Sequence, residues 1–160
     1  MKKLIVIYYS FDGNTKEAAL RIAQELGSDI EELIPEKEIP REGAKKFMVG
    51  GRQAAFGECP PIKPVKADIR SYDGIILGTP VWAGKCAPSI NTFLKEHDCA
   101  DKVFAVFTSS GGGDNEKCMK ALGKKLPDIR YSVPLADRKS PASSENESRL
   151  SAFIEKVKHD

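Results

Sequence analysis

Residues 8–15 read Tyr8-Tyr9-Ser10-Phe11-Asp12-Gly13-Asn14-Thr15, and the organisation of the whole chain can be reasoned outward from them. An apolar run over residues 4–7 precedes this turn, and a helical pattern over residues 14–26 follows it. A buried strand therefore leads through a tight, polar turn into a helix. Such a turn directs backbone N–H groups, hydroxyls and the positive end of a helix at one place, and a phosphate is the natural ligand there.

The same turn also has an interpretation without a ligand. Asn14 is a good N-cap residue, and Glu17 three residues later completes the pattern of a capping box. The turn lacks the third glycine of the dinucleotide fingerprint and the Gly-Lys-Ser/Thr of a P-loop. Its assignment as a phosphate site therefore depends on what the rest of the chain places beside it.

Size and composition restrict the class of protein. A chain of 160 residues predicts one domain, residues 1–160, with a substantial core. The 25 Lys and Arg residues nearly balance the 23 Asp and Glu residues and form no basic block, so we expect no nucleic-acid partner. No apolar run approaches the roughly 20 residues of a membrane span. The N-terminal apolar run is too short for a signal peptide, so we expect a cytoplasmic protein without a membrane partner.

The four cysteines are far apart in the sequence and form no C-x-x-C motif. This spacing predicts neither a disulfide framework nor a zinc site, and we expect no metal. Each thiol is expected to be a small buried hydrophobic group or to have no special role. The residues concerned are Cys59, Cys86, Cys99 and Cys118.

Strand and helix patterns alternate along the whole chain, which predicts an α/β fold with a five-stranded parallel sheet covered by helices on both faces. Ligands of such sheets bind beyond the carboxyl ends of the strands. Residues 35–70 are expected to be a crossover connection without a chemical role. The predicted strands are residues 3–9, 29–33, 73–78, 102–108 and 130–135, and the predicted helices are residues 14–26, 41–56, 115–126 and two more that begin near residues 88 and 143.

Local signals predict where several of these elements begin and end. Pro80 is expected to end the third strand and to open a loop over residues 79–85. Asp114 is expected to cap the helix at residues 115–126, and Ser144 with Glu147 to form a capping box for the last helix. Gly50-Gly51 weakens the helix at residues 41–56 by about 1 kcal/mol for each glycine.

Three unusual loops follow the first, third and fourth predicted strands, at residues 10–15, 79–85 and 109–114. The first offers hydroxyls and N–H groups, the second carries the large flat ring of Trp82, and the third has three consecutive glycines that admit a ligand close to the backbone. A ligand with a phosphate at one end and a planar heteroaromatic ring at the other fits all three, and FMN is such a ligand. Separately, each loop also allows an interpretation without a ligand, with Trp82 as a core or interface residue and the glycines as a flexible loop.

These loops resemble those of the flavodoxin family. The first resembles the flavodoxin phosphate loop Ser/Thr-x-Thr-Gly-x-Thr, with Asp12 in place of the usual threonine, and the second and third resemble loops of small flavodoxin-like FMN proteins. The resemblance covers essentially the whole chain and implies a flavodoxin-like three-layer α/β/α sandwich, strand order 2-1-3-4-5 and a non-covalent FMN. It implies no catalytic side chain. The FMN-binding residues that it implies are Ser10, Phe11, Asp12, Gly13, Asn14, Thr15, Thr79, Pro80, Val81, Trp82, Ala83, Gly84, Ser110, Gly111, Gly112 and Asp114.

Two functions remain open on this resemblance. One is an electron carrier that passes single electrons through FMN to a redox partner protein. The other is an FMN-dependent NAD(P)H oxidoreductase that reduces a small electron acceptor such as a quinone, a nitroaromatic compound or a flavin. The third alternative, a response-regulator receiver, is excluded because the first and third strands end in Tyr9-Ser10 and Gly78-Thr79 rather than in acidic residues.

Departures from the family pattern bear on this choice. The isoelectric point of about 8.3 differs from the acidic surface usual in electron-carrier flavodoxins. The tyrosine that usually stacks on the outer face of the flavin is missing from residues 109–114, which leaves Trp82 as the expected aromatic cover. Both departures favour the oxidoreductase. The lack of a nicotinamide-binding signature and of a catalytic His or Tyr favours the carrier.

Overall fold

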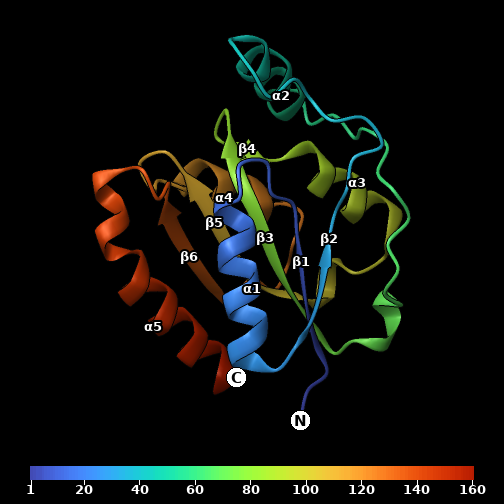
Figure 1. Cartoon of the computed structure of the whole chain (residues 1–160). Coiled ribbons are helices and arrows are strands. Elements are labelled where there is room, and N and C mark those ends of the chain that lie inside the picture. The colour runs from blue at the N-terminus through green and yellow to red at the C-terminus, as the bar shows by residue number, and fades with distance from the viewer.

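A twisted sheet forms the centre of the computed structural model, which describes residues 1–160 (Figure 1). Its strands lie in the order β2-β1-β3-β5-β6, and every pairing along this path is parallel. The predicted order is confirmed, with β5 and β6 as the fourth and fifth predicted strands. A short β4 (Lys85–Cys86) pairs antiparallel with the end of β3. The other strands are β1 (Leu4–Tyr8), β2 (Asp29–Glu32), β3 (Gly74–Trp82), β5 (Val103–Ser110) and β6 (Tyr131–Ala136).

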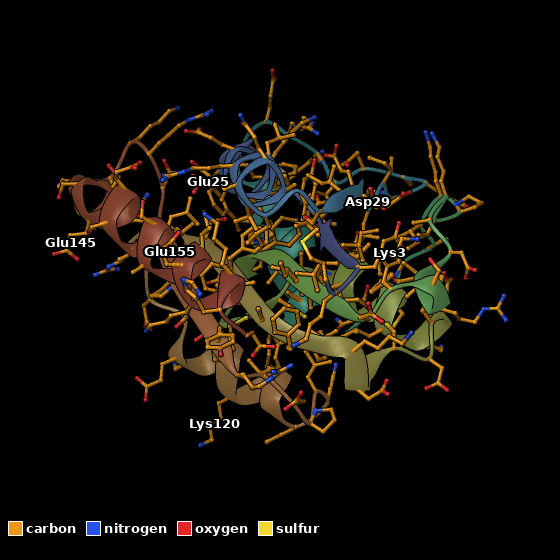
Figure 2. All side chains as sticks on the ribbon, turned by 90° about the horizontal axis from the view of Figure 1, so that it is seen from below. Lys3, Glu25, Asp29, Lys120, Glu145 and Glu155 are labelled. Carbon is orange, nitrogen blue, oxygen red and sulfur yellow. The ribbon has the colours of Figure 1, made fainter.

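Helices cover both faces of the sheet and complete the predicted sandwich. One face carries α1 (Asn14–Leu26) and α5 (Asn146–Lys158), and the other carries α3 (Pro88–Glu96) and α4 (Glu116–Gly123). Figure 2 shows these layers from below, with Glu25 of α1 and Lys120 of α4 on opposite sides of the sheet. The remaining helix, α2 (Lys45–Ala55), lies apart from both layers, beyond the carboxyl ends of the strands (Figure 1). Short 3-10 helices occur at η1 (Ile69–Ser71), η2 (Ala100–Lys102) and η3 (Pro141–Glu145).

The central strands are apolar along their whole length because successive side chains enter different layers. In β1, Ile5 and Ile7 pack into a cluster of 19 buried residues on the α3 and α4 face. Val6 and Tyr8 pack into a cluster of 16 buried residues on the α1 and α5 face. Both faces therefore have cores of similar size, which is why the first apolar run shows no polar alternation.

The prediction that Pro80 ends the third strand was wrong. β3 continues through Trp82, and Pro80 lies in register with Ser109 of β5. The Gly78 carbonyl accepts the Tyr9 N–H at 3.1 Å, so Gly78 faces β1, and Pro80 faces the same side because strand residues alternate. By that point β1 has turned away into its loop, so the missing N–H of proline costs no ladder hydrogen bond.

Three predicted helix starts also need correction. The N-cap of α1 is Gly13 rather than Asn14. The N-cap of α4 is Asn115, although the carboxylate of Asp114 accepts the Glu116 N–H at 3.0 Å. The expected capping box at Ser144 is absent, because η3 occupies residues 141–145 and α5 begins only at Asn146.

Other expectations concerned metals, thiols and membranes. No group of three or more His, Cys, Asp and Glu side chains is placed to hold a metal ion. All four cysteines are free; Cys59 is exposed, and the other three are buried as small hydrophobic groups. None of the helices combines the length and the apolar character needed to cross a bilayer.

Candidate functional site

A cavity of about 510 Å³ opens where β1, β3 and β5 end, and we call it the sheet-end cavity. The first and third predicted loops and the end of β3 meet there, as the parallel topology requires. Its volume lies in the usual range for small-molecule sites. The lining residues are Phe11, Asp12, Asn14, Ile39, Lys46, Phe47, Gly51, Pro80, Val81, Trp82, Ala83, Ser109, Ser110, Gly111 and Asp137.

Nine of the sixteen predicted site residues line this cavity, and seven do not. Thr79 is fully buried and has a structural role: its hydroxyl accepts the Ala87 N–H at 2.9 Å and donates to the Pro80 carbonyl at 2.8 Å. Gly84 lines a neighbouring cavity instead. The others outside the lining are Ser10, Gly13, Thr15, Gly112 and Asp114.

The turn after β1 is held by its own side chains. Gly13 has a φ of +98°, which a residue with a side chain rarely adopts. The Ser10 hydroxyl accepts the Lys16 N–H at 3.1 Å, and the Asp12 carboxylate accepts the Asn14 N–H at 3.3 Å. Two of the first N–H groups of α1 thus donate to side-chain oxygen atoms of the turn. The oxygen atoms of a bound phosphate could replace these acceptors.

Thr15 links this turn to β5. Its side chain is buried, and its Oγ1 lies 2.7 Å from the Oγ of Ser109, so the two hydroxyls share a hydrogen bond. Ser109 itself lines the sheet-end cavity. The pair therefore fixes the turn against the neighbouring strand end, and sequence reasoning had included Thr15 but not Ser109.

Arg138 is a residue that sequence reasoning missed. Its backbone N–H donates to the Asn14 side-chain carbonyl at 3.2 Å, and its guanidinium donates to the Asp12 backbone carbonyl at 3.3 Å. The same guanidinium lies 3.4 Å from the Glu17 carboxylate. Arg138 thus brings a positive charge to the turn, which offsets the negative charge of Asp12. Arg138 lies just beyond β6, at the same sheet edge as the other loops, and this position could have indicated that it belongs to the site.

The crossover before β3 is part of the site, contrary to the expectation that residues 35–70 have no chemical role. Four of its residues line the sheet-end cavity, three of them in α2: Ile39, Lys46, Phe47 and Gly51. In addition, the Arg41 guanidinium donates to the Phe11 carbonyl at 2.7 Å and lies 5.0 Å from the centre of its ring. α2 and the segment before it therefore cover the side of the cavity that the sheet leaves open.

Trp82 stands in an aromatic cluster at the cavity wall. Its ring meets Tyr9 edge to face with centroids 5.6 Å apart, and Phe11 in the same manner at 5.7 Å. A Cβ on Gly50 would lie 3.3 Å from the Trp82 ring and 2.9 Å from the Ile39 side chain. The glycine that weakens α2 as a helix is therefore what lets α2 approach the tryptophan. Burial, together with the Glu38 carboxylate, raises the pKa of Tyr9 well above its ordinary value, so its phenol stays neutral.

Trp82 is followed by a two-residue hairpin that connects β3 to β4. Both of its residues have positive φ, +49° for Ala83 and +72° for Gly84, as a type I′ turn requires. Ala83 is the only non-glycine residue with positive φ, and this conformation costs a residue with a side chain about 1–2 kcal/mol. The strain falls on a residue that lines the sheet-end cavity.

The cavity lining combines a few charged groups with apolar side chains. One cation, Lys46, and two carboxylates, Asp12 and Asp137, line it beside apolar side chains. No His, Cys or Tyr is among the lining residues. The arrangement can hold and orient a planar ligand, while any redox chemistry has to come from the ligand itself.

Comparisons with known proteins agree with this geometry. The protein-family model described as flavodoxin matches residues 3–157. A flavoprotein from Lactobacillus acidophilus NCFM, solved in complex with FMN, is 26% identical with a TM-score of 0.70, over 93% of this chain and 99% of its own. Flavodoxin 1 from Bacillus cereus shares the fold, with 22% identity and a TM-score of 0.54 over 99% of both chains.

A curated relative has an enzyme name. The "NAD(P)H dehydrogenase (quinone) 3" of Rhizobium meliloti (strain 1021) is 30% identical over 126 residues. The match covers 69% of this chain but only 54% of that relative. The chain therefore matches about half the length of this enzyme.

Proposed function

This chain belongs to the flavodoxin family, and we propose that it binds FMN non-covalently in the sheet-end cavity and transfers electrons through it. The observation that carries the proposal is the meeting of the turn after β1, Trp82 and residues 109–111 around one cavity of about 510 Å³. Bound FMN supplies the redox chemistry, and the protein binds it, orients it and excludes water from it.

The residues present fit the two ends of this cofactor. Backbone N–H groups at the start of α1 and the hydroxyls of Ser10 and Thr15 would exchange their present hydrogen bonds within the protein for the phosphate, with Arg138 balancing the charge of Asp12. Pro80, Val81 and Trp82 offer an apolar wall for the ring. The Gly111 backbone lies open at the other side, where polar ring atoms need partners.

An electron carrier is one form of this function. The lining has no His, Cys or Tyr, and single-electron transfer to a docked redox partner protein requires no side chain that acts as an acid or base. The four free cysteines support a reducing location such as the cytoplasm.

An NAD(P)H oxidoreductase is the second form, and a specific observation favours it. The Rhizobium meliloti relative carries that activity in its name, and the surface beside the cavity is basic rather than acidic. On this form, a small acceptor such as a quinone would follow the nucleotide into the open cavity.

A spectroscopic experiment separates the two forms. The purified protein is titrated with FMN, and NADPH is then added without oxygen while the visible absorbance is followed. Bleaching of the flavin by NADPH alone supports the oxidoreductase, and bleaching only after a separate reductase is added supports the carrier. Failure to bind FMN at all contradicts both.

A further inference from the structure

A second cavity, of about 500 Å³, lies between the end of α2, the β3–β4 hairpin and α4. We call it the lysine pocket, after Lys85, Lys117, Lys120, Lys124 and Lys125, which line it. The other lining residues are small or apolar apart from Asn91. They are Ala54, Ala55, Phe56, Gly57, Ala83, Gly84, Cys86, Asn91, Ala121 and Leu122.

The lysines of the pocket have no carboxylate partners in contact with them. No Asp or Glu is among its lining residues. None of its five lysines forms an ion pair, whereas Lys2, Lys16 and Lys158 on other surfaces each pair with a carboxylate. Five positive charges around one concave surface repel one another and raise the local concentration of anions.

The floor of the pocket is polar and ordered. Asn91 is buried, and its side-chain carbonyl accepts the Lys125 ammonium at 3.1 Å and the Cys86 thiol at 3.4 Å. Its amide donates to the Glu58 carbonyl at 3.3 Å. Burial raises the pKa of Cys86 to about 11, so the thiol stays neutral and adds no negative charge. The floor therefore holds the Lys125 ammonium in place and adds no negative charge to the pocket.

One wall of the pocket is an exposed aromatic ring. Phe56 follows α2 directly and keeps 78% of its surface accessible, although it is a large apolar residue. Figure 2 shows Lys120 projecting from α4 away from the sheet. A ring beside exposed ammonium groups is a combination that can bind a base and its phosphates, by stacking and by charge.

The lysine pocket adjoins the sheet-end cavity. Ala83 lines both of them. On the pocket side, a Cβ on Gly84 would lie 3.3 Å from the Lys117 side chain, so this lysine rests against the hairpin. A ligand anchored among the lysines thus needs to cross only a two-residue turn to reach the cavity proposed for FMN.

We propose that the lysine pocket binds the adenosine phosphates of NADPH and selects it over NADH. The 2′-phosphate and the diphosphate would meet the lysines, the adenine would lie on Phe56, and the nicotinamide would extend across Ala83 toward the flavin. Bound there, NADPH would supply a hydride, which is two electrons and one proton, to FMN and would leave as NADP⁺. This inference rests on the oxidoreductase form of the proposed function.

The test measures binding of NADP⁺ to the FMN-loaded protein by calorimetry at low salt, before and after Lys120→Gln with Lys124→Gln. We expect NADP⁺ affinity to fall at least about 10-fold, because a charge-assisted hydrogen bond is typically worth more than one tenfold step. NAD⁺ affinity should fall less. The control is Lys95→Gln with Lys156→Gln, which removes the same charge from exposed lysines outside both cavities and should leave NADP⁺ affinity unchanged.

Each other outcome has a definite meaning. Equal NADP⁺ affinity in the wild-type and double-variant proteins, or no binding to either, overturns the inference. Binding of inorganic pyrophosphate without binding of NADP⁺ also overturns it, because the lysines would then serve another phosphate compound. FMN content is read from the visible spectrum first. A protein that cannot hold FMN contradicts the proposed function, whereas an FMN-loaded protein that does not bind NADP⁺ contradicts the inference about the lysine pocket and leaves FMN binding and electron transfer standing.

Discussion

The sheet-end cavity and the lysine pocket lie on either side of the β3–β4 hairpin and have nearly equal volumes, about 510 and 500 Å³. Their linings differ in charge. The sheet-end cavity combines one lysine, two carboxylates and several apolar side chains, whereas the lysine pocket has five cations and no carboxylate. Cavity volume therefore does not determine which ligand binds in which cavity. The difference in charge agrees with our proposals, which place a planar ring with one phosphate in the first cavity and a more highly phosphorylated nucleotide in the second.

The largest expected effect is on the aromatic wall of the sheet-end cavity. Trp82→Ala should weaken FMN binding by about 1–3 kcal/mol if the ring contacts the flavin, on the scale known for bases stacked on aromatic side chains. Titration of the apoprotein with FMN measures the change. Phe56→Ala is the matched control, because Phe56 lines only the lysine pocket and its loss should leave FMN affinity intact. Unchanged affinity in Trp82→Ala would remove Trp82 from the FMN site.

The same Phe56→Ala variant tests whether the lysine pocket binds the adenine of a nucleotide. It should weaken NADP⁺ and NAD⁺ by a similar factor, worth about 1 kcal/mol, because both carry the adenine that stacks on an aromatic ring. Substitution of the lysines should instead affect NADP⁺ more than NAD⁺. Calorimetry with both nucleotides on FMN-loaded protein measures the two patterns. A Phe56→Ala variant that discriminates between the nucleotides would argue against adenine stacking there.

A smaller effect is expected at the turn after β1. Thr15→Ala should weaken FMN by about 1 kcal/mol, the typical net value of one hydrogen bond, and should weaken riboflavin less because riboflavin has no phosphate. Fluorescence titration with both flavins gives the comparison. Ser109→Ala removes the other hydroxyl of the same 2.7 Å pair and separates fixing of the turn from direct binding. Equal losses for FMN and riboflavin would contradict the phosphate assignment.

The smallest effect is expected at the hairpin itself. Ala83→Gly should stabilise the protein by about 0.5–1 kcal/mol, because glycine adopts positive φ without a steric penalty. Ala152→Gly, the same substitution at an exposed position inside α5, should destabilise by about 1 kcal/mol. Thermal unfolding of both variants measures whether each substitution raises or lowers the stability. A destabilised Ala83→Gly variant would show that the alanine makes a contact worth more than the strain.

The fold and half of the site follow from local patterns. Apolar runs such as residues 4–7 and the alternation of strands and helices predict a parallel sheet, and parallel strands bring their following loops to one edge. This is why the sequence alone predicts that residues 10–15 and 109–114 lie at the same edge of the sheet. The resemblance supplied the strand order, which the structure confirms.

The remainder depends on contacts that no local pattern contains. Pro80 was misplaced because a missing N–H matters only where a neighbouring strand offers a partner, and β1 has ended at that point. The role of α2 was missed because helical spacing does not say what a helix will cover. Gly50 appeared to be a weakness, but its missing side chain makes room for Trp82. The lysine pocket joins Lys85 to lysines more than thirty residues later, which only the tertiary fold brings together.

The shared wall at Ala83 has a thermodynamic consequence. Because one residue borders both cavities, any shift of the hairpin that follows occupation of one cavity also changes the shape of the other. Linkage then requires the effect to be reciprocal: if FMN alters nucleotide affinity by some factor, the nucleotide alters FMN affinity by the same factor. The two-residue turn would thus couple the two cavities, and the coupling can be measured as the change in affinity for either ligand. Lengthening the turn by insertion should weaken this coupling before it abolishes binding at either cavity.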